Sequence, residues 1–382
     1  VGGFRPDQLA ALPPKVMGEM DRKQFAALPP EAIGGFKPEQ FAALPPEAIG
    51  RFNPEQFAAL PPEAIGGFRP QQFAELPLEA VGGFRPDQLA ALSPKVIGEM
   101  GRKQFGRLSP EAIEGFKPEQ FAALPPEAIG RFNPEQFAAL PPEAMVGFNS
   151  KQFKELPPAA MKGFKPEQFE VLPPKIFEAM RPEQFGKLPP IAFQGFNPDQ
   201  LNNLPVDVMG EFSPEDLGFL PPQAMVGFTS KQFKELPPAA MKGFKPEQFE
   251  VLPPKVFEAM RPEQFGKLPP IALQGVNSDQ LKNLPVDVMG EFSPKDLGFL
   301  PPEAMVGFTS KQFKELPPAA MKGFKPEQFE VLPPKVFEAM RPEQFGKLPA
   351  EAFEGFQSSQ LKKVQSELFE VVSPGVFSQI NP

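Results

Sequence analysis

A strict 16-residue period constrains this chain more than any other feature of its sequence. Stepping by 16 from Phe4 reaches 24 positions, of which 17 are Phe, 5 are Met and 2 are Val. Eight residues after each of these positions lies a second register, which holds Leu at 22 of 24 positions. The unit reads F-x-P-E-Q-F-x-x-L-P-P-x-A-[IM]-x-G and consists of two related octads. Such a period predicts a repeat architecture rather than a globular domain.

Each octad carries the signals that start and then stop a very short helix. In residues 51–57, RFNPEQF, Asn53 suits the N-cap and Pro54 the first helical position, where its missing N–H costs nothing. The helix cannot continue past Leu60, because the residue before a proline is pushed out of the α region. Glycines such as Gly34 and Gly35 end the second helix, and we expect a left-handed residue there to reverse the chain.

These signals predict a repeat solenoid in which each 16-residue unit forms one coil, with two very short α or 3₁₀ turns joined by extended corners. One unit buries too few side chains to offset its conformational entropy, so neighbouring coils must stack. The predicted core has four inward side chains in each unit. In the first and third units these are Phe4, Leu9, Leu12 and Met17, and Phe36, Phe41, Leu44 and Ile49.

Three other architectures are weighed against this prediction. A β-solenoid uses coils of similar length, but the recurrent prolines remove donors from a strand ladder and β-branched residues are scarce. Disorder fits the 56 prolines, yet a disordered chain lacks strictly periodic Phe and Leu. Tetratricopeptide and HEAT repeats need roughly 34 to 47 residues per unit. The helical solenoid remains favoured, with the β-solenoid as the alternative.

A slower, 80-residue period lies over the shorter one. Met replaces Phe at Met20, Met100, Met180, Met260 and Met340, which indicates growth by copying blocks of five units. We expect a continuous solenoid over residues 1–364, with 80-residue blocks that start near residues 1, 81, 161, 241 and 321. Residues 365–382 keep the apolar spacing but lose most prolines, so they are predicted to be a degenerate last repeat that caps the solenoid.

One polar position recurs as regularly as the apolar ones. It is Gln in 21 of 24 units, the exceptions being Asp216, Asp296 and Val376. We predict an interior ladder in which each Gln bonds backbone groups of its own or the next coil. The first members are Gln8, Gln24, Gln40, Gln56 and Gln72. The competing interpretation is an exposed row of amides that grips a polymer such as a glycan.

The composition disfavours most kinds of chemistry. The chain has no Cys, His, Trp or Tyr, so it lacks thiolates, the commonest general base and the commonest transition-metal ligand. Rows of acidic residues such as Glu39 and Glu47 suit a solvated face better than a calcium site, because no calcium-loop motif is present. We therefore expect no enzyme activity, no cofactor and no metal. The net charge of −8 and the lack of a long apolar run argue against nucleic acid and membrane insertion.

The octads FKPEQFAA and LPPEAIGG resemble the degenerate octapeptide repeats of some very large bacterial surface or secreted proteins. The resemblance covers nearly the whole chain and rests on a short pattern. It implies a bacterial, extracellular or cell-surface repeat region that spaces or polymerises, and it implies no catalytic residues. Ice-nucleation proteins share only the 16-residue period, since their Thr and Ser rows are absent here.

The expected function is structural: a solenoid rod of 24 coils that serves as a surface stalk or as the subunit of an extracellular filament. Because the chain opens in mid-unit, we expect the terminal coils to expose apolar residues and to associate head to tail with another copy. The predicted end contacts are Phe4, Leu9, Phe377 and Ile380. The alternative is a repeat scaffold that binds a glycan or peptide partner, but exposed positions such as Arg5, Asp21 and Lys37 differ freely between units.

Overall fold

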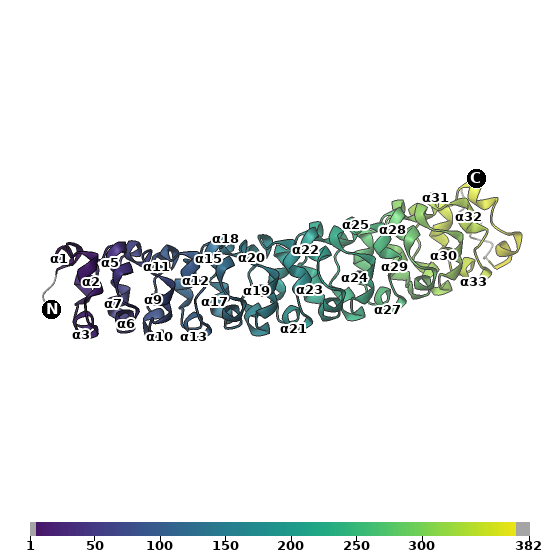
Figure 1. Ribbon diagram of the computed structural model, residues 1–382. Coiled ribbons are helices and arrows are strands. Elements are labelled where there is room, and N and C mark those ends of the chain that lie inside the picture. The colour runs from purple at the N-terminus through teal and green to yellow at the C-terminus, as the bar shows by residue number, and fades with distance from the viewer. Residues whose placement is uncertain (1–4, 372–382) are drawn as a thin grey trace. The chain divides into compact units, whose positions relative to one another are not determined.

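The computed structural model describes residues 5–371 and divides into two compact units, Val1–Gly195 and Phe196–Pro382. Within each unit, short helices follow one another around a central axis (Figure 1). All regular elements within residues 5–371 are helical, comprising 34 α-helices and 12 3₁₀-helices of four to six residues, and no strand occurs among them. The predicted helical repeat solenoid is confirmed, and the β-solenoid alternative is wrong.

The first unit contains the elements up to Gly195. Their bounds are α1 (Pro6–Ala10), α2 (Pro14–Gly18), α3 (Arg22–Ala26), α4 (Pro30–Ile33), α5 (Pro38–Ala43), α6 (Pro46–Ile49), α7 (Pro54–Ala58), α8 (Pro62–Ile65), α9 (Pro70–Ala74), α10 (Leu78–Val81), α11 (Pro86–Ala91), α12 (Pro94–Ile97), α13 (Arg102–Phe105), α14 (Pro110–Ile113), α15 (Pro118–Ala123), α16 (Pro126–Ile129), α17 (Pro134–Ala138), α18 (Pro142–Met145), α19 (Ser150–Glu155), η1 (Pro158–Gly163), α20 (Pro166–Glu170), η2 (Pro174–Ala179), α21 (Pro182–Phe185) and η3 (Pro190–Gly195).

The second unit again has one short helix in each of its described octads. Most of those octads that begin with Leu form 3₁₀-helices. Their bounds are α22 (Pro198–Asn202), η4 (Val206–Glu211), α23 (Pro214–Phe219), η5 (Pro222–Gly227), α24 (Ser230–Glu235), η6 (Pro238–Gly243), α25 (Pro246–Val251), α26 (Pro254–Phe257), α27 (Pro262–Phe265), η7 (Pro270–Gly275), α28 (Ser278–Asn283), η8 (Val286–Glu291), α29 (Pro294–Phe299), η9 (Pro302–Gly307), α30 (Ser310–Glu315), η10 (Pro318–Gly323), α31 (Pro326–Val331), α32 (Pro334–Phe337), α33 (Pro342–Phe345), η11 (Ala350–Gly355), α34 (Ser358–Leu361) and η12 (Ser366–Val371).

The local structure follows the predicted start and stop signals. Before α7, the N-cap Asn53 is extended, and its side chain accepts a hydrogen bond from the backbone N–H of Gln56 at 2.7 Å. Pro54 takes the first helical position. Two octads earlier, α5 ends before Leu44, which is extended at φ −58° and ψ 136° because Pro45 follows it. Each 16-residue unit therefore forms two short helical turns, as predicted.

The expectation of left-handed glycines at the helix ends is wrong. No residue of the described part of the chain, glycine included, has a positive φ. Gly34, for example, has φ −56° and ψ −14°, which is ordinary right-handed helical backbone. The corners therefore turn through extended residues such as Leu44 and Pro45, and none of them is a sharp reversal.

The coil itself is longer than predicted. We call octads that begin at the Phe register F-octads and those that begin at the Leu register L-octads. Helix α5 packs against α2 and α8, and α29 packs against η7 and η10. In each case, as in the other packed helix pairs, the partners are three octads apart. One coil is therefore a 24-residue turn of three octads, and it does not coincide with the 16-residue sequence repeat.

The gentle corners explain the third octad. Two corners would each have to reverse the chain completely, whereas three corners share one full turn. Extended residues before proline supply the gentler bend, because proline fixes φ and holds its predecessor in the β region. Since F-octads and L-octads alternate and stacked octads lie three apart, each F-octad inside a unit packs between two L-octads. The sequence repeat of two octads and the coil of three octads thus differ in length.

The predicted core residues are largely confirmed. Leu9, Met17, Phe36, Phe41, Leu44 and Ile49 are at most 3% exposed. Leu12 is only partly buried, and Phe4 lies outside the described residues. The prediction omitted one member of the core, since Ala48 and its equivalents are buried as well. Phenylalanine rings from successive coils meet edge to face, with ring centroids 4.6 Å apart for Phe41 and Phe68.

Glycine is required where two coils approach most closely. A Cβ built on Gly323 would overlap the backbone oxygen of Pro294, at the start of the helix in the preceding coil. Gly227, Gly243 and Gly275 stand in the same relation to the residues 29 positions before them. These glycines precede the first residue of an F-octad, so their role is close packing between coils and not a special backbone conformation.

We expect Gly323→Ala to destabilise the second unit by about 1 to 3 kcal/mol, because the added methyl group meets backbone atoms that cannot move aside. The matched control is Gly290→Ala, since nothing lies within 4 Å of a Cβ built on Gly290. That control should be neutral or slightly stabilising. Thermal and denaturant unfolding followed by circular dichroism measures both effects, and equal stability of the two variants would contradict the close approach.

Candidate functional site

The glutamine of each F-octad forms the main polar link between coils. Gln248 Nε2 donates to the carbonyl oxygens of Leu217 at 2.7 Å and Leu220 at 2.8 Å, which lie 31 and 28 residues earlier. Its Oε1 accepts a hydrogen bond from the backbone N–H of Lys245 at 2.9 Å, at the start of its own helix. One amide therefore caps its own helix, supplies a donor to Leu220 O at the end of an earlier helix, and adds a second donor to Leu217 O, which already accepts from the N–H of Leu220 at 3.2 Å.

The glutamine ladder is the set of buried glutamines that bond in this way. It comprises Gln40, Gln56, Gln72, Gln88, Gln104, Gln120, Gln136, Gln152, Gln168, Gln184, Gln232, Gln248, Gln264, Gln280, Gln312, Gln328, Gln344 and Gln360. The predicted interior ladder is confirmed for Gln40, Gln56 and Gln72, and the competing exposed row is wrong for these residues.

Two predicted members do not complete a rung. Gln8 and Gln24 are exposed, although each caps its own helix through Oε1. The prediction of an interior position for Gln8 and Gln24 is therefore wrong.

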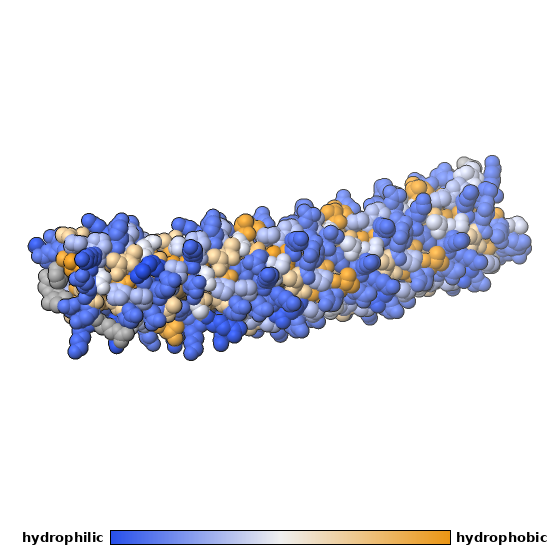
Figure 2. All heavy atoms as spheres, viewed as in Figure 1, coloured by the Kyte–Doolittle hydropathy of each residue, from blue (hydrophilic) through white to orange (hydrophobic). Residues whose placement is uncertain are grey.

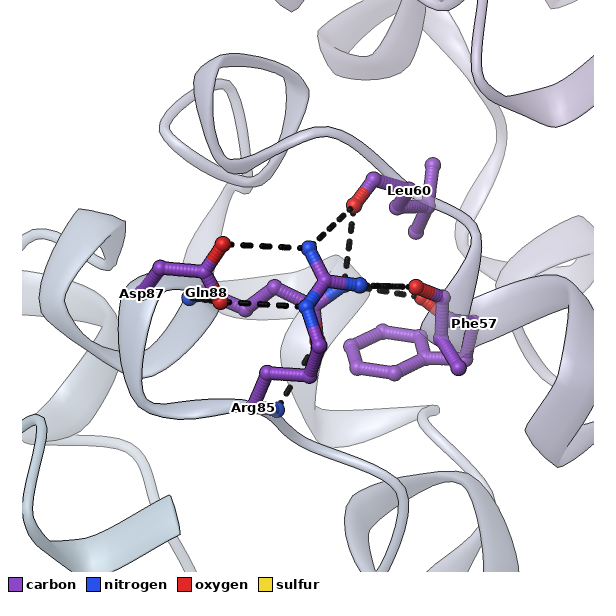
Figure 3. A network of polar contacts seen from close by, with 6 residues as sticks. Phe57, Leu60, Arg85, Asp87 and Gln88 are labelled. Atoms are coloured by element: carbon purple, nitrogen blue, oxygen red, sulfur yellow. Dashed lines mark hydrogen bonds and ion pairs between the residues drawn. The ribbon is translucent and has the colours of Figure 1, made fainter.

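Figure 3 shows one rung together with a basic residue that reinforces it. Gln88 Nε2 donates to the carbonyl oxygens of Phe57 at 3.1 Å and Leu60 at 2.8 Å. The Arg85 guanidinium donates to the carbonyls of Ala58 and Leu60 and pairs with Asp87, with Nε and Oδ1 3.1 Å apart. The hydrogen bond from Arg85 lowers the pKa of Asp87, against a smaller opposing effect of desolvation.

Arginine at the N-cap position adds a second donor to the same corner carbonyl. Leu316 O accepts from Gln344 Nε2 at 2.8 Å and from Arg341 Nη2 at 3.1 Å. Arg69, Arg181 and Arg261 donate in the same way to the leucine 25 residues earlier. Sequence reasoning missed this contact, and the available signal was the arginine that precedes the first proline of these F-octads.

The predicted end contacts are not brought together by the structure. Leu9 is fully buried at 0% exposure, because α1 packs against α4, so the expectation that it forms an exposed contact surface is wrong. Phe4, Phe377 and Ile380 lie outside the described residues. Self-association through these four residues therefore finds no support in the geometry of Leu9.

Two open grooves lie among the described residues of the second unit. One lies between Lys295 and Lys325 over Phe299 and Pro301. The other includes Lys234, Lys255, Glu258 and Arg261, and its hydroxyl group, Ser230 Oγ, donates to the carbonyl of Lys255 at 2.9 Å and not to a base. Neither groove contains a nucleophile paired with a general base.

Two further features of residues 5–371 bear on ligands and membranes. No three of their acidic side chains come together in a way that could hold a metal ion. None of their helices has the length and apolar character that crossing a bilayer requires.

No family model and no curated protein matches the chain. Among solved structures, the leucine-rich repeat-containing protein LegL7 from Legionella pneumophila is similar at 12% identity, over 85% of this chain and 86% of that chain, with a TM-score of 0.14. A TM-score this low carries no argument. The assignment of a helical repeat solenoid therefore rests on the helix packing of this chain itself.

We expect Gln248→Ala to destabilise the second unit by about 2 to 4 kcal/mol, because Leu220 O loses its donor, Leu217 O loses one of two donors and the Lys245 N–H loses its acceptor. The matched control is Gln24→Ala, which removes only the bond to its own N-cap and should cost about 1 kcal/mol or less. Unfolding by urea, with hydrogen exchange of the local amides, measures both. Similar costs for the two variants would show that the inter-coil bonds contribute little.

Proposed function

We propose that the chain is a structural protein whose stacked coils act as a spacer or as part of a filament. The observation that carries this proposal is the ladder, because each rung uses its polar groups on the preceding coil and leaves none for a ligand. Arginines at the coil edge, such as Arg341, bond backbone carbonyls in the same way. The most regular features of the chain thus serve cohesion between coils.

The arrangement of exposed residues supports a spacer over a repeat scaffold. Val226 and Val306 are 49% and 55% exposed and lie ten octads apart. Since ten octads are three coils plus one octad, the two valines lie on neighbouring faces of the unit. The surface in Figure 2 is mainly hydrophilic, with apolar residues in separate small groups. A scaffold for a glycan or peptide needs equivalent residues in one row, so we rank this function second to the spacer.

Association of one copy with the next and an extracellular location belong to the same proposal. Rungs of the same kind as that of Gln248, formed between the end coil of one copy and the first coil of the next, would join the copies. The extracellular or cell-surface location rests on the resemblance of the octads to repeats of bacterial surface proteins. Analytical ultracentrifugation tests the association, and a monomer at high concentration would contradict it.

A spacer of this kind should tolerate a 16-residue deletion better than a 24-residue deletion, although three octads make one coil. Deleting residues 308–323 keeps F-octads and L-octads in alternation, so every rung still meets the end of an F-octad. Deleting residues 308–331 joins two L-octads and places like octads on each other, with rungs that face the wrong helix ends.

We therefore expect the 16-residue deletion to keep most of the melting temperature and to shorten the hydrodynamic radius. The 24-residue deletion should melt markedly lower. Circular dichroism and size-exclusion chromatography with light scattering measure these properties. The alternation account is contradicted if the 24-residue deletion is the more stable of the two.

A further inference from the structure

Two F-octads of the second unit carry aspartate where the ladder has glutamine, at Asp216 and Asp296. Each aspartate keeps the half of the rung that lies within its own helix. Oδ2 of Asp216 accepts from the N–H of Ser213 at 2.8 Å, and Oδ2 of Asp296 accepts from the N–H of Ser293 at 2.7 Å. The serine hydroxyls cap the same helices in return, so these octads still start a helix.

The other half of the rung is lost at Asp296. In the neighbouring rungs, Gln280 donates to Phe249 O at 2.7 Å and Leu252 O at 2.8 Å, and Gln312 donates to Leu281 O and Leu284 O. The same spacing sets Asp296 opposite the carbonyls of Phe265 and Leu268. An ionised carboxylate has no hydrogen to donate and its side chain is one methylene shorter than glutamine. No hydrogen bond joins Asp296 to either carbonyl within the described residues.

The missing bonds also change the electrostatics of the junction. A carboxylate opposite two carbonyl oxygens adds repulsion where glutamine adds two donated bonds, and the surrounding Phe265 and Leu268 are 3% and 7% exposed. The Asp296 junction is therefore weaker than the Gln280 and Gln312 junctions on either side of it. Asp216 places the same side chain at the same octad position in a more buried setting, at 9% exposure.

We propose that the octad of Asp296 is a built-in opening point, which loosens before the glutamine octads on either side of it do. This inference does not depend on the proposed structural role, because it concerns only the relative strength of the octads.

Hydrogen exchange measured by mass spectrometry tests the proposal on the full chain. At neutral pH we expect amides of residues 292–299 to exchange about tenfold or more faster than those of residues 308–315. Asp296→Gln should remove this difference. Equal protection of aspartate and glutamine octads in the unsubstituted chain, or no slowing in Asp296→Gln, would overturn the proposal.

A further variant keeps the test decisive. Gln312→Asp should create a new fast-exchanging octad at residues 308–315. If that variant fails to fold, Asp296→Gln still decides, because it restores the residue that most F-octads carry.

Discussion

The hydrogen bonds from one glutamine to the carbonyls 28 and 31 residues earlier are the interaction on which the rest of the structure depends. A helix of four to six residues leaves most of its backbone groups unpaired, and burying them without partners would be costly. In the ladder, Gln248 pairs a helix start in one coil with a helix end in another. Phenylalanine rings fill the core, and the glutamines fix the position of each coil relative to its neighbour.

The octad, the sequence repeat and the coil differ in length, and this difference determines which residues share a face of each unit. The octad makes one helix, two octads make the sequence repeat, and three octads close the coil. Every face of a unit therefore presents F-octads and L-octads alternately, and a given position of the repeat returns to the same face only in every second coil. Features that recur after ten octads, such as Val226 and Val306, move from one face to the next.

The helices and the core were accessible from the sequence because they depend on neighbours in the chain. Pro54 with Asn53 defines a helix start, and Phe36, Phe41, Leu44 and Ile49 are buried as the apolar registers predict. The number of octads in one coil was not accessible, since it depends on how far each extended corner bends. The length of the octad does not specify that angle. For the same reason, the close approach of Gly323 to Pro294 became apparent only from the stacking of the coils.

The 24-residue coil can be tested most directly by cross-linking, because the chain has no cysteine of its own. Ser310 Oγ donates to the carbonyl of Lys335 at 2.9 Å, across three octads. Cysteines introduced by Ser310→Cys and Lys335→Cys should therefore react together with a short thiol cross-linker. Ser310→Cys with Glu327→Cys occupies the same octad positions two octads apart and should not. Efficient cross-linking of the second pair without the first would contradict the three-octad coil.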